Sequence, residues 1–281
     1  MFDKYVARMS RPTPGWPALQ KIRFVMHALL ISNVGLVIVY FMPKPFPGKD
    51  NPWNGSFAYW MLALIYVGFM TLFKLPSLSF MRLPLLDWKS GIAMLVALAV
   101  AAQRVDLGML AHKSAWTLFV GIITLLSIGL GEEIVSRGFV YGIFTRFGQN
   151  FAIVLSSVLF GLLHLGWYMG KYWDPWMAYW HVANAAASGF FLCCLMIACR
   201  SIWPAVLLHG VWDWRIGFDY ANVPFPKAGH TTHSAFMTGI TAPLRQLVPC
   251  VFFGMTLVYL RGGTLPKWLE KVALRFKLVE V

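Results

Sequence analysis

Apolar stretches close to the length that crosses a lipid bilayer recur along the whole chain of 281 residues. A membrane-spanning helix needs about 20 mainly apolar residues. The composition fits this pattern, because 58% of the residues are hydrophobic and 12% are charged, whereas a soluble domain carries roughly 25% charged residues. The stretches lie near residues 22–42, 55–73, 88–103, 114–145, 150–168, 176–199, 203–218 and 244–261. We therefore expect an all-α, polytopic transmembrane bundle of about eight helices.

The distribution of basic residues predicts the orientation of this bundle. Lys and Arg gather in the two terminal tails and in the turns that would lie on the same side of the membrane as the tails. Cytoplasmic segments carry an excess of these residues, so we expect both termini to be cytoplasmic. The net charge of +13 is then explained by orientation and by contact with membrane lipids, and we expect no nucleic-acid partner. Residues 1–281 should form a single integral membrane domain, ending in an amphipathic tail over 262–281 or, alternatively, a solvated one.

Three charged residues follow one of the most apolar runs, 116–130. They are Glu132, Glu133 and Arg137. Charged side chains inside a membrane span are rare and usually functional. Glu133 precedes Arg137 by four positions, the favourable order for an ion pair within a helix, so this pair is expected to act as a support. Glu132 is turned about 100° away and is free to act as a general base. The alternative is that the Glu-Arg pair is only a structural clamp.

The stretch that holds these charges is unusually long. Residues 114–145 would form roughly 50 Å of helix, which exceeds the ~30 Å hydrocarbon core of a bilayer. We therefore expect this helix to project, tilt or break, with Gly138 and Gly142 as the positions for a break.

Two further pairs of residues lie in the fifth and seventh stretches. Phe160 and His164 are four positions apart, and so are His209 and Asp213. Residues at this spacing share one helix face, so each pair can point into the bundle interior. A lone histidine in a span is usually a packed polar residue. His181 begins the sixth stretch beside small residues, for example, which favours helix packing.

Helix rise predicts that these polar groups meet at one depth. Glu132 and His164 each lie about 14 residues, or roughly 21 Å of helix, from the polar turn at 146–150. Asp213 lies about 13 residues, or roughly 20 Å, beyond Arg200 on the same side of the membrane. Polar groups from three helices should therefore converge on one layer, and this convergence favours a functional site over a purely structural role.

The carboxylates and imidazoles of such a layer are suited to the hydrolysis of a peptide bond. A water molecule between Glu132 and His164 could be activated for attack on an amide carbonyl. His209 and Asp213 could then face the oxyanion that develops during the attack.

The ordered set of motifs resembles a known family, the CAAX protease and bacteriocin-processing family, which is also called CPBP or Abi. The resemblance covers about residues 114–218, the expected catalytic core. It rests on three motifs: Glu132-Glu133-x-x-x-Arg137, Phe160-x-x-x-His164 and His209-x-x-x-Asp213. Members of this family are intramembrane glutamic endopeptidases.

The resemblance implies a specific activity and setting. It implies that Glu132 and His164 activate water, and that His209 and residue 213 stabilise the oxyanion, with no cofactor. Glu133, Arg137 and Phe160 would support them. It further implies an eight-helix core whose cavity opens to the cytoplasm and the membrane, and a membrane-associated peptide or protein as substrate.

One position departs from the pattern of the prenyl-protein proteases, where residue 213 is often Asn. An ionised Asp213 cannot donate a hydrogen bond to an oxyanion. It must therefore be protonated, or it must orient His209 instead. The Asp form resembles that of bacterial members, which weakens the expectation of prenylated substrates. We expect the protein to lie in a bacterial inner membrane.

Two other functions remain open at this stage. Glu132, His164 and His209 could bind zinc, because three protein ligands and a water are typical of catalytic zinc. Alternatively, the chain could be a non-enzymatic membrane protein, such as a bacteriocin immunity-type factor.

Overall fold

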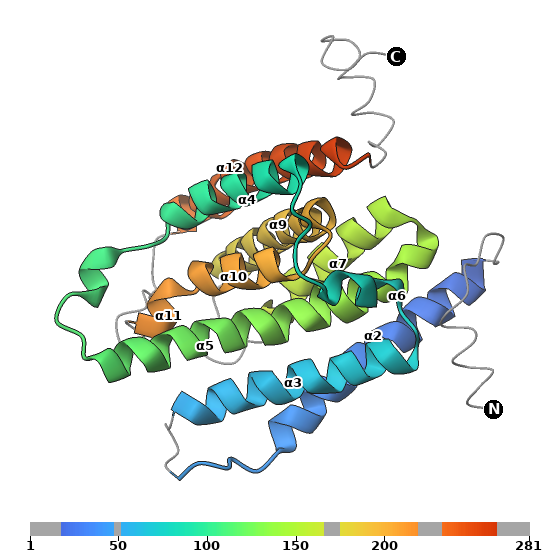
Figure 1. Cartoon of the computed structure of the whole chain (residues 1–281). Coiled ribbons are helices and arrows are strands. Elements are labelled where there is room, and N and C mark those ends of the chain that lie inside the picture. The colour runs from blue at the N-terminus through green and yellow to red at the C-terminus, as the bar shows by residue number, and fades with distance from the viewer. Residues whose placement is uncertain (1–17, 48–51, 166–174, 219–231, 263–281) are drawn as a thin grey trace.

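The computed structural model describes residues 18–47, 52–165, 175–218 and 232–262. Throughout these residues every regular element is a helix (Figure 1), which confirms the predicted all-α fold. The expected tail over 262–281 falls almost entirely outside the described residues. The membrane side of the two termini stays a prediction.

The helices follow the predicted apolar stretches closely. They are α2 (Ala18–Phe41), α3 (Pro52–Leu72), η1 (Pro76–Met81), α4 (Trp88–Ala102), η2 (Leu107–Leu110), α5 (Ala115–Glu133), η3 (Ile134–Val140), α6 (Tyr141–Phe144), η4 (Thr145–Phe147), α7 (Gln149–Leu163), α9 (Pro175–Cys199), α10 (Trp203–Trp212), α11 (Trp214–Phe218) and α12 (Thr232–Leu260). By length and composition, four helical segments of the described chain can cross a membrane: Ile22–Val39, Trp53–Leu72, Ala115–Phe147 and Ala178–Cys199. Helices α4, α7 and the end of α12 are apolar but shorter. The number of spans therefore stays a prediction.

Local sequence signals explain where several helices begin. Ser114 precedes α5, and its hydroxyl accepts a hydrogen bond from the backbone N–H of Thr117. Asp87 caps α4 in the same way through the N–H of Ser90. Both are preferred N-cap residues because they satisfy a free N–H of the first turn. Gly148 has φ of 104°, a conformation that favours glycine, and it forms the tight turn that reverses the chain into α7.

The long segment from α5 to η4 is interrupted near Gly138, as its length predicts. Residues Ile134–Val140 form a π-helix between α5 and α6. A π-helical turn adds a residue to the helical repeat and occurs often at functional sites. Glu132 and Glu133 are the last two residues before this turn, and Arg137 lies within it.

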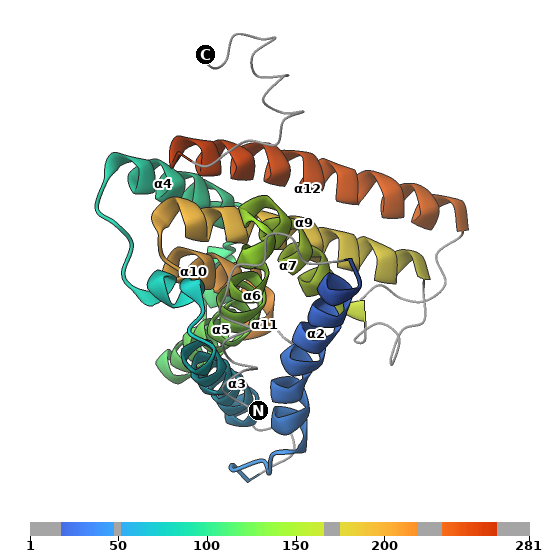
Figure 2. The ribbon, with the colours of Figure 1, turned by 90° about the vertical axis from the view of Figure 1, so that its right-hand side faces the viewer.

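Helix α9 lies at the centre of the molecule. It packs against α12, α7, α10 and α4, while α5 packs against α3 and α10. The two ribbon views show the same order of layers, from α12 and α4 through α9, α10 and α7 to α5 and α3 (Figures 1 and 2). Cys193 and Cys194 of α9 are fully buried free thiols.

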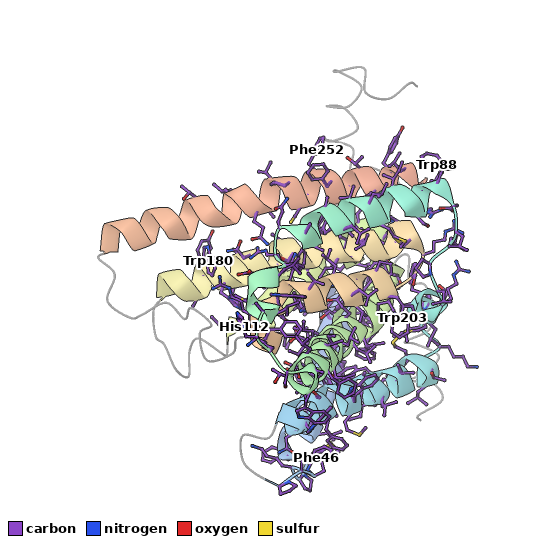
Figure 3. All side chains as sticks on the ribbon, turned by 60° about the vertical axis from the view of Figure 1, so that its left-hand side comes forward. Phe46, Trp88, His112, Trp180, Trp203 and Phe252 are labelled. Atoms are coloured by element: carbon purple, nitrogen blue, oxygen red, sulfur yellow. The ribbon has the colours of Figure 1, made fainter. Side chains whose placement is uncertain are left out.

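The outer faces of the bundle are strongly apolar. Trp88 on α4 and Phe252 on α12 are 64% and 59% exposed, and both project from the outer side of the molecule (Figure 3). Large exposed apolar surfaces are rare on soluble monomers. They match an integral membrane protein whose surface faces lipid.

Candidate active site

Glu132 is the meeting point of three helices. Its Oε2 lies 3.9 Å from Nε2 of His164, the C-cap of α7, and 3.6 Å from Nε2 of His209 on α10. About a quarter of each side chain, 23% for Glu132 and 25% for His164, remains exposed. The predicted convergence of these polar groups on one layer is therefore confirmed, while their catalytic roles stay a prediction.

His164 is held by its own helix. Its Nδ1 lies 2.8 Å from the carbonyl oxygen of Phe160, and a carbonyl only accepts hydrogen bonds. Nδ1 therefore carries the hydrogen, and Nε2 turns toward Glu132. The ring of Phe160 stands edge-on to the imidazole, with 4.8 Å between ring centroids. In the neutral imidazole, Nε2 is then a hydrogen-bond acceptor that faces a second acceptor, the Glu132 carboxylate.

His209 is held by Glu133. The distance from Nδ1 of His209 to Oε1 of Glu133 is 2.6 Å. Nδ1 donates this bond because the carboxylate accepts, which leaves Nε2 facing both Glu132 and Asp213. His209 has 8% of its side chain exposed and Glu133 has none. The motif spacing did not predict this contact, because it assigned Glu133 to Arg137 alone.

The predicted ion pair between Glu133 and Arg137 is present. Nη1 of Arg137 donates to Oε1 of Glu133 over 2.9 Å, and both side chains are fully buried. The guanidinium carbon lies 4.3 Å from the centroid of the Phe160 ring, within the range of a cation–π contact. Gly189 on α9 leaves room for the arginine, since an added Cβ there would lie 2.8 Å from Nη2. Phe160 and Arg137 thus support both His164 and Glu133.

Asp213 ends α10 and lies at the rim of the cluster. Its Oδ2 is 3.7 Å from Nε2 of His209, with 24% of the side chain exposed. That separation exceeds a hydrogen bond. Asp213 was expected either to donate to the oxyanion or to orient His209. In the structure it is Glu133 that holds His209 by a hydrogen bond.

Glycines bring the helices close enough for these contacts. An added Cβ at Gly129 of α5 would overlap the carbonyl oxygen of Val206, and one at Gly210 of α10 would lie 2.8 Å from the carbonyl oxygen of Leu125. Small residues of this kind let membrane helices approach with their backbones in contact. The close approach of α5 and α10 is what places His209 beside Glu133.

Two residues of the site were missed by sequence reasoning. The hydroxyl of Tyr59, on α3, donates to Oε1 of Glu132 over 3.3 Å. The ring of His181, on α9, lies 5.1 Å from that of His164. Tyr59 lies in an apolar run without a motif, so the sequence carries no signal for it. His181 was visible as a polar residue in a span but was assigned to packing.

The described side chains do not form a ready metal site. Among them, no group of three or more His, Cys, Asp or Glu residues is arranged to hold a metal ion. Tetrahedral zinc with bonds of about 2.0 Å places its ligand atoms roughly 3.3 Å apart, whereas Oε2 of Glu132 lies 3.9 Å and 3.6 Å from the two histidine Nε2 atoms. The residues of the zinc alternative therefore do not fit the ion as they lie.

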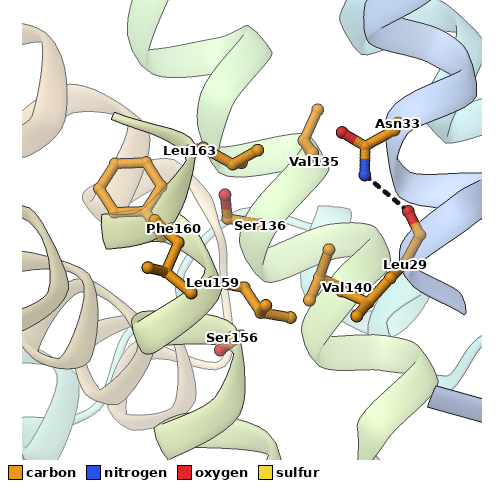
Figure 4. Close-up of a pocket in the computed structure, with 10 residues that line it drawn as sticks. Leu29, Asn33, Val135, Ser136, Val140, Ser156, Leu159, Phe160 and Leu163 are labelled. Atoms are coloured by element: carbon orange, nitrogen blue, oxygen red, sulfur yellow. Dashed lines mark hydrogen bonds between the residues drawn. The ribbon is translucent and has the colours of Figure 1, made fainter. Parts of the chain in front are cut away.

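A mainly apolar cavity adjoins the cluster. It lies between α2, η3 and α7 and holds about 220 Å³. Phe160, Leu159 and Leu163 form one side, Leu29 and Asn33 of α2 form the other, and Ser136 lies between them (Figure 4). Phe160 thus belongs to both, since it lines this cavity and its ring also contacts His164 and Arg137.

The fold and the cluster together define an all-helical membrane protein that carries carboxylates and imidazoles inside its bundle. Residues 114–215 match the family model described as Rce1-like, "Type II CAAX prenyl endopeptidase Rce1-like". This segment of the chain is thus Rce1-like, and the match confirms the predicted resemblance to the CAAX protease family. It supports a CAAX-type intramembrane endopeptidase, a peptide hydrolase, in general terms. Comparisons with curated proteins and with solved structures gave no match.

Proposed function

We propose that this protein is an intramembrane endopeptidase of the glutamic class, in which Glu132 and His164 activate the water that attacks the substrate. One observation carries the proposal: Oε2 of Glu132 faces Nε2 of His164 across 3.9 Å. Two hydrogen-bond acceptors at that separation suit a water that donates one hydrogen to each, as polar groups more than about 3.5 Å apart often share a bridging water. The lone pairs of this water then point at the substrate.

The proposed reaction uses this arrangement in the following steps. The water oxygen forms a bond to the carbonyl carbon, and its proton passes to Glu132. The carbonyl oxygen becomes an oxyanion, which accepts a hydrogen bond from Nε2 of His209, while Nδ1 of the same ring donates to Glu133; this requires the protonated form of His209. When the carbon–nitrogen bond breaks, Glu132 returns the proton to the leaving amine. Asp213 takes part as a second donor to the oxyanion, which requires its protonated form.

The apolar cavity favours a substrate with an apolar portion. The space of about 220 Å³ beside Phe160 is lined mainly by leucine and valine side chains. A membrane-associated peptide could place a lipid chain or apolar side chains there while its backbone reaches Glu132. The matching family model names prenyl endopeptidases, whereas the Asp at 213 resembles bacterial members. We therefore propose a bacterial inner membrane as the location of the protein, and a paired peptide assay distinguishes prenylated from unmodified substrates.

Two quenched fluorescent peptides test this function. Both carry a cysteine three residues from the C-terminus, farnesylated in one peptide and unmodified in the other. The purified protein in liposomes should cleave at least one, and Glu132→Gln should cleave neither. The control variant is Glu280→Gln, outside the matched segment, which should retain wild-type cleavage. A Glu132→Gln protein that cleaves like the wild type would overturn the proposal.

The alternatives give different results in the same assay. A zinc protease would lose activity with a chelator such as 1,10-phenanthroline and regain it with added zinc, whereas a glutamic protease would not respond. An immunity-type factor would protect cells from a bacteriocin equally well with Glu132→Gln.

A further inference from the structure

Tyr59 brings helix α3 into the candidate site. It lies on α3, outside the segment that matches the family model. Its hydroxyl donates to Oε1 of Glu132 over 3.3 Å, across 73 positions of sequence. Because Oε1 is engaged by the tyrosine, Oε2 is the oxygen that faces the two histidines.

The packing of α3 against α5 holds Tyr59 in this place. An added Cβ at Gly131, the residue before Glu132, would lie 2.8 Å from the Tyr59 ring and 3.0 Å from its carbonyl oxygen. The two helices therefore touch directly at the Tyr59 backbone. Gly131 is buried, so any side chain there would push α3 away and take the hydroxyl out of reach. Backbone packing therefore brings the Tyr59 side chain within reach of Glu132.

We propose that Tyr59 is a positioning residue that fixes the rotation of the Glu132 carboxylate. A carboxylate on a glutamate side chain rotates freely about its last bond unless a partner holds one oxygen. The Glu132 side chain is 23% exposed, and Arg137, the cation of the same helical segment, is paired with Glu133. The Tyr59 hydroxyl holds Oε1 and aims Oε2 at the water site beside His164. The kinetic part of this inference rests on the proposed function, but the contact itself does not.

Two measurements on Tyr59→Phe test the inference. The infrared band of the Glu132 carboxyl group is isolated by subtracting the spectrum of Glu132→Gln from that of the wild type. A second difference spectrum, Tyr59→Phe minus Tyr59→Phe/Glu132→Gln, gives the same band without the tyrosine hydroxyl. Loss of the hydrogen bond should shift this band. On the cleaved quenched peptide, kcat should fall about tenfold with KM changed less than about twofold, because a hydrogen bond to a charged group is worth roughly that factor.

Tyr66→Phe is the matched control. Tyr66 lies two turns further along α3 and packs against Phe69 and Phe139, so its substitution should leave the Glu132 band and kcat unchanged. An unshifted band in Tyr59→Phe, or a shifted band with wild-type kcat, would overturn the positioning role. If the wild type cleaves neither peptide, the proposed function fails, and the infrared band still reports separately whether Tyr59 holds Glu132.

Discussion

Glu133 and His209 are joined by a hydrogen bond of 2.6 Å across 76 positions of sequence. The same oxygen, Oε1, also accepts the hydrogen bond from Arg137. One fully buried carboxylate oxygen thus links α5, the π-helix and α10. The charged pair that the sequence shows as a local support is therefore also the group that orients a histidine of the candidate site.

Arg137→Ala should reduce both stability and activity. The substitution leaves Glu133 fully buried without its cation, and breaking a buried ion pair costs about 3–5 kcal/mol. We expect a clear fall in the unfolding midpoint in a denaturant titration in detergent, together with loss of peptide cleavage. Arg104→Ala, which removes an exposed cation, is the control. An Arg137→Ala protein as stable as the control would contradict a stabilising role for the ion pair of Arg137 and Glu133.

His164→Ala should abolish cleavage while the protein stays folded. The side chain is 25% exposed, so its removal leaves little buried volume empty, but the water loses one of its two acceptors. Loss of a general acid–base group typically lowers the rate by about 10²–10⁴. The comparison is with His27→Ala on α2, where the histidine is exposed and its Nδ1 bonds the carbonyl oxygen of Arg23 in the same helix. Equal cleavage by the two variants would remove His164 from the mechanism.

Asp213 should tolerate Asn but not Ala. An Asn side chain donates a hydrogen bond at any pH, whereas Asp does so only when protonated. Asp213→Asn should therefore retain activity, and Asp213→Ala should lose about 10²–10³ in kcat, the usual effect of removing an oxyanion donor. The measurement is kcat on the cleaved quenched peptide. If Asp213→Asn is as inactive as Asp213→Ala, the reaction requires the carboxylate of Asp213, and the proposed role of this residue as a hydrogen-bond donor is wrong.

A second charged cluster predicts how stability depends on pH. Arg261, at the end of α12, donates to both carboxylate oxygens of Asp87 and to the hydroxyl of Ser90. The hydrogen bond from Arg261, followed by that from the Ser90 backbone, holds the pKa of Asp87 well below its ordinary value. A lowered folded-state pKa gives stability that is complete above the unfolded value of about 4 and is lost as pH falls through the folded one.

Asp87→Asn should remove this dependence. Its unfolding midpoint should be lower than that of the wild type at neutral pH, and the difference should shrink below about pH 4. Asp106→Asn is a suitable comparison, because Asp106 also caps a helix, through the N–H of Gly108. If Asp87→Asn shows the same acid dependence of stability as the wild type, the ion pair of Asp87 and Arg261 does not contribute to that dependence.

Much of this architecture follows from local rules. Apolar length predicted the helices, and the i, i+4 spacing predicted the pair of Glu133 and Arg137. The constant rise per residue of a helix predicted that Glu132 and His164 lie at the same depth in the bundle. These predictions succeed because each depends on the geometry of one helix or one hairpin.

The remaining features depend on how the helices rotate and approach. Whether Glu133 reaches His209 is decided by the backbone contact at Gly129 and Gly210, and spacing within a motif does not encode it. The Tyr59 contact joins helices far apart in sequence. The membrane side of the termini and the number of spans also depend on the bilayer, because α4 and α7 are shorter than a typical span.

The most direct test of water activation by Glu132 compares the peptides released in native membranes. Membranes that contain the wild-type protein, and membranes that contain Glu132→Gln at equal abundance, are analysed by mass spectrometry for new peptide ends. We predict a defined set of cleaved peptides that appears with the wild type and is absent with Glu132→Gln. The same set of cleaved peptides in both membranes would contradict the role of Glu132 as the base that activates water.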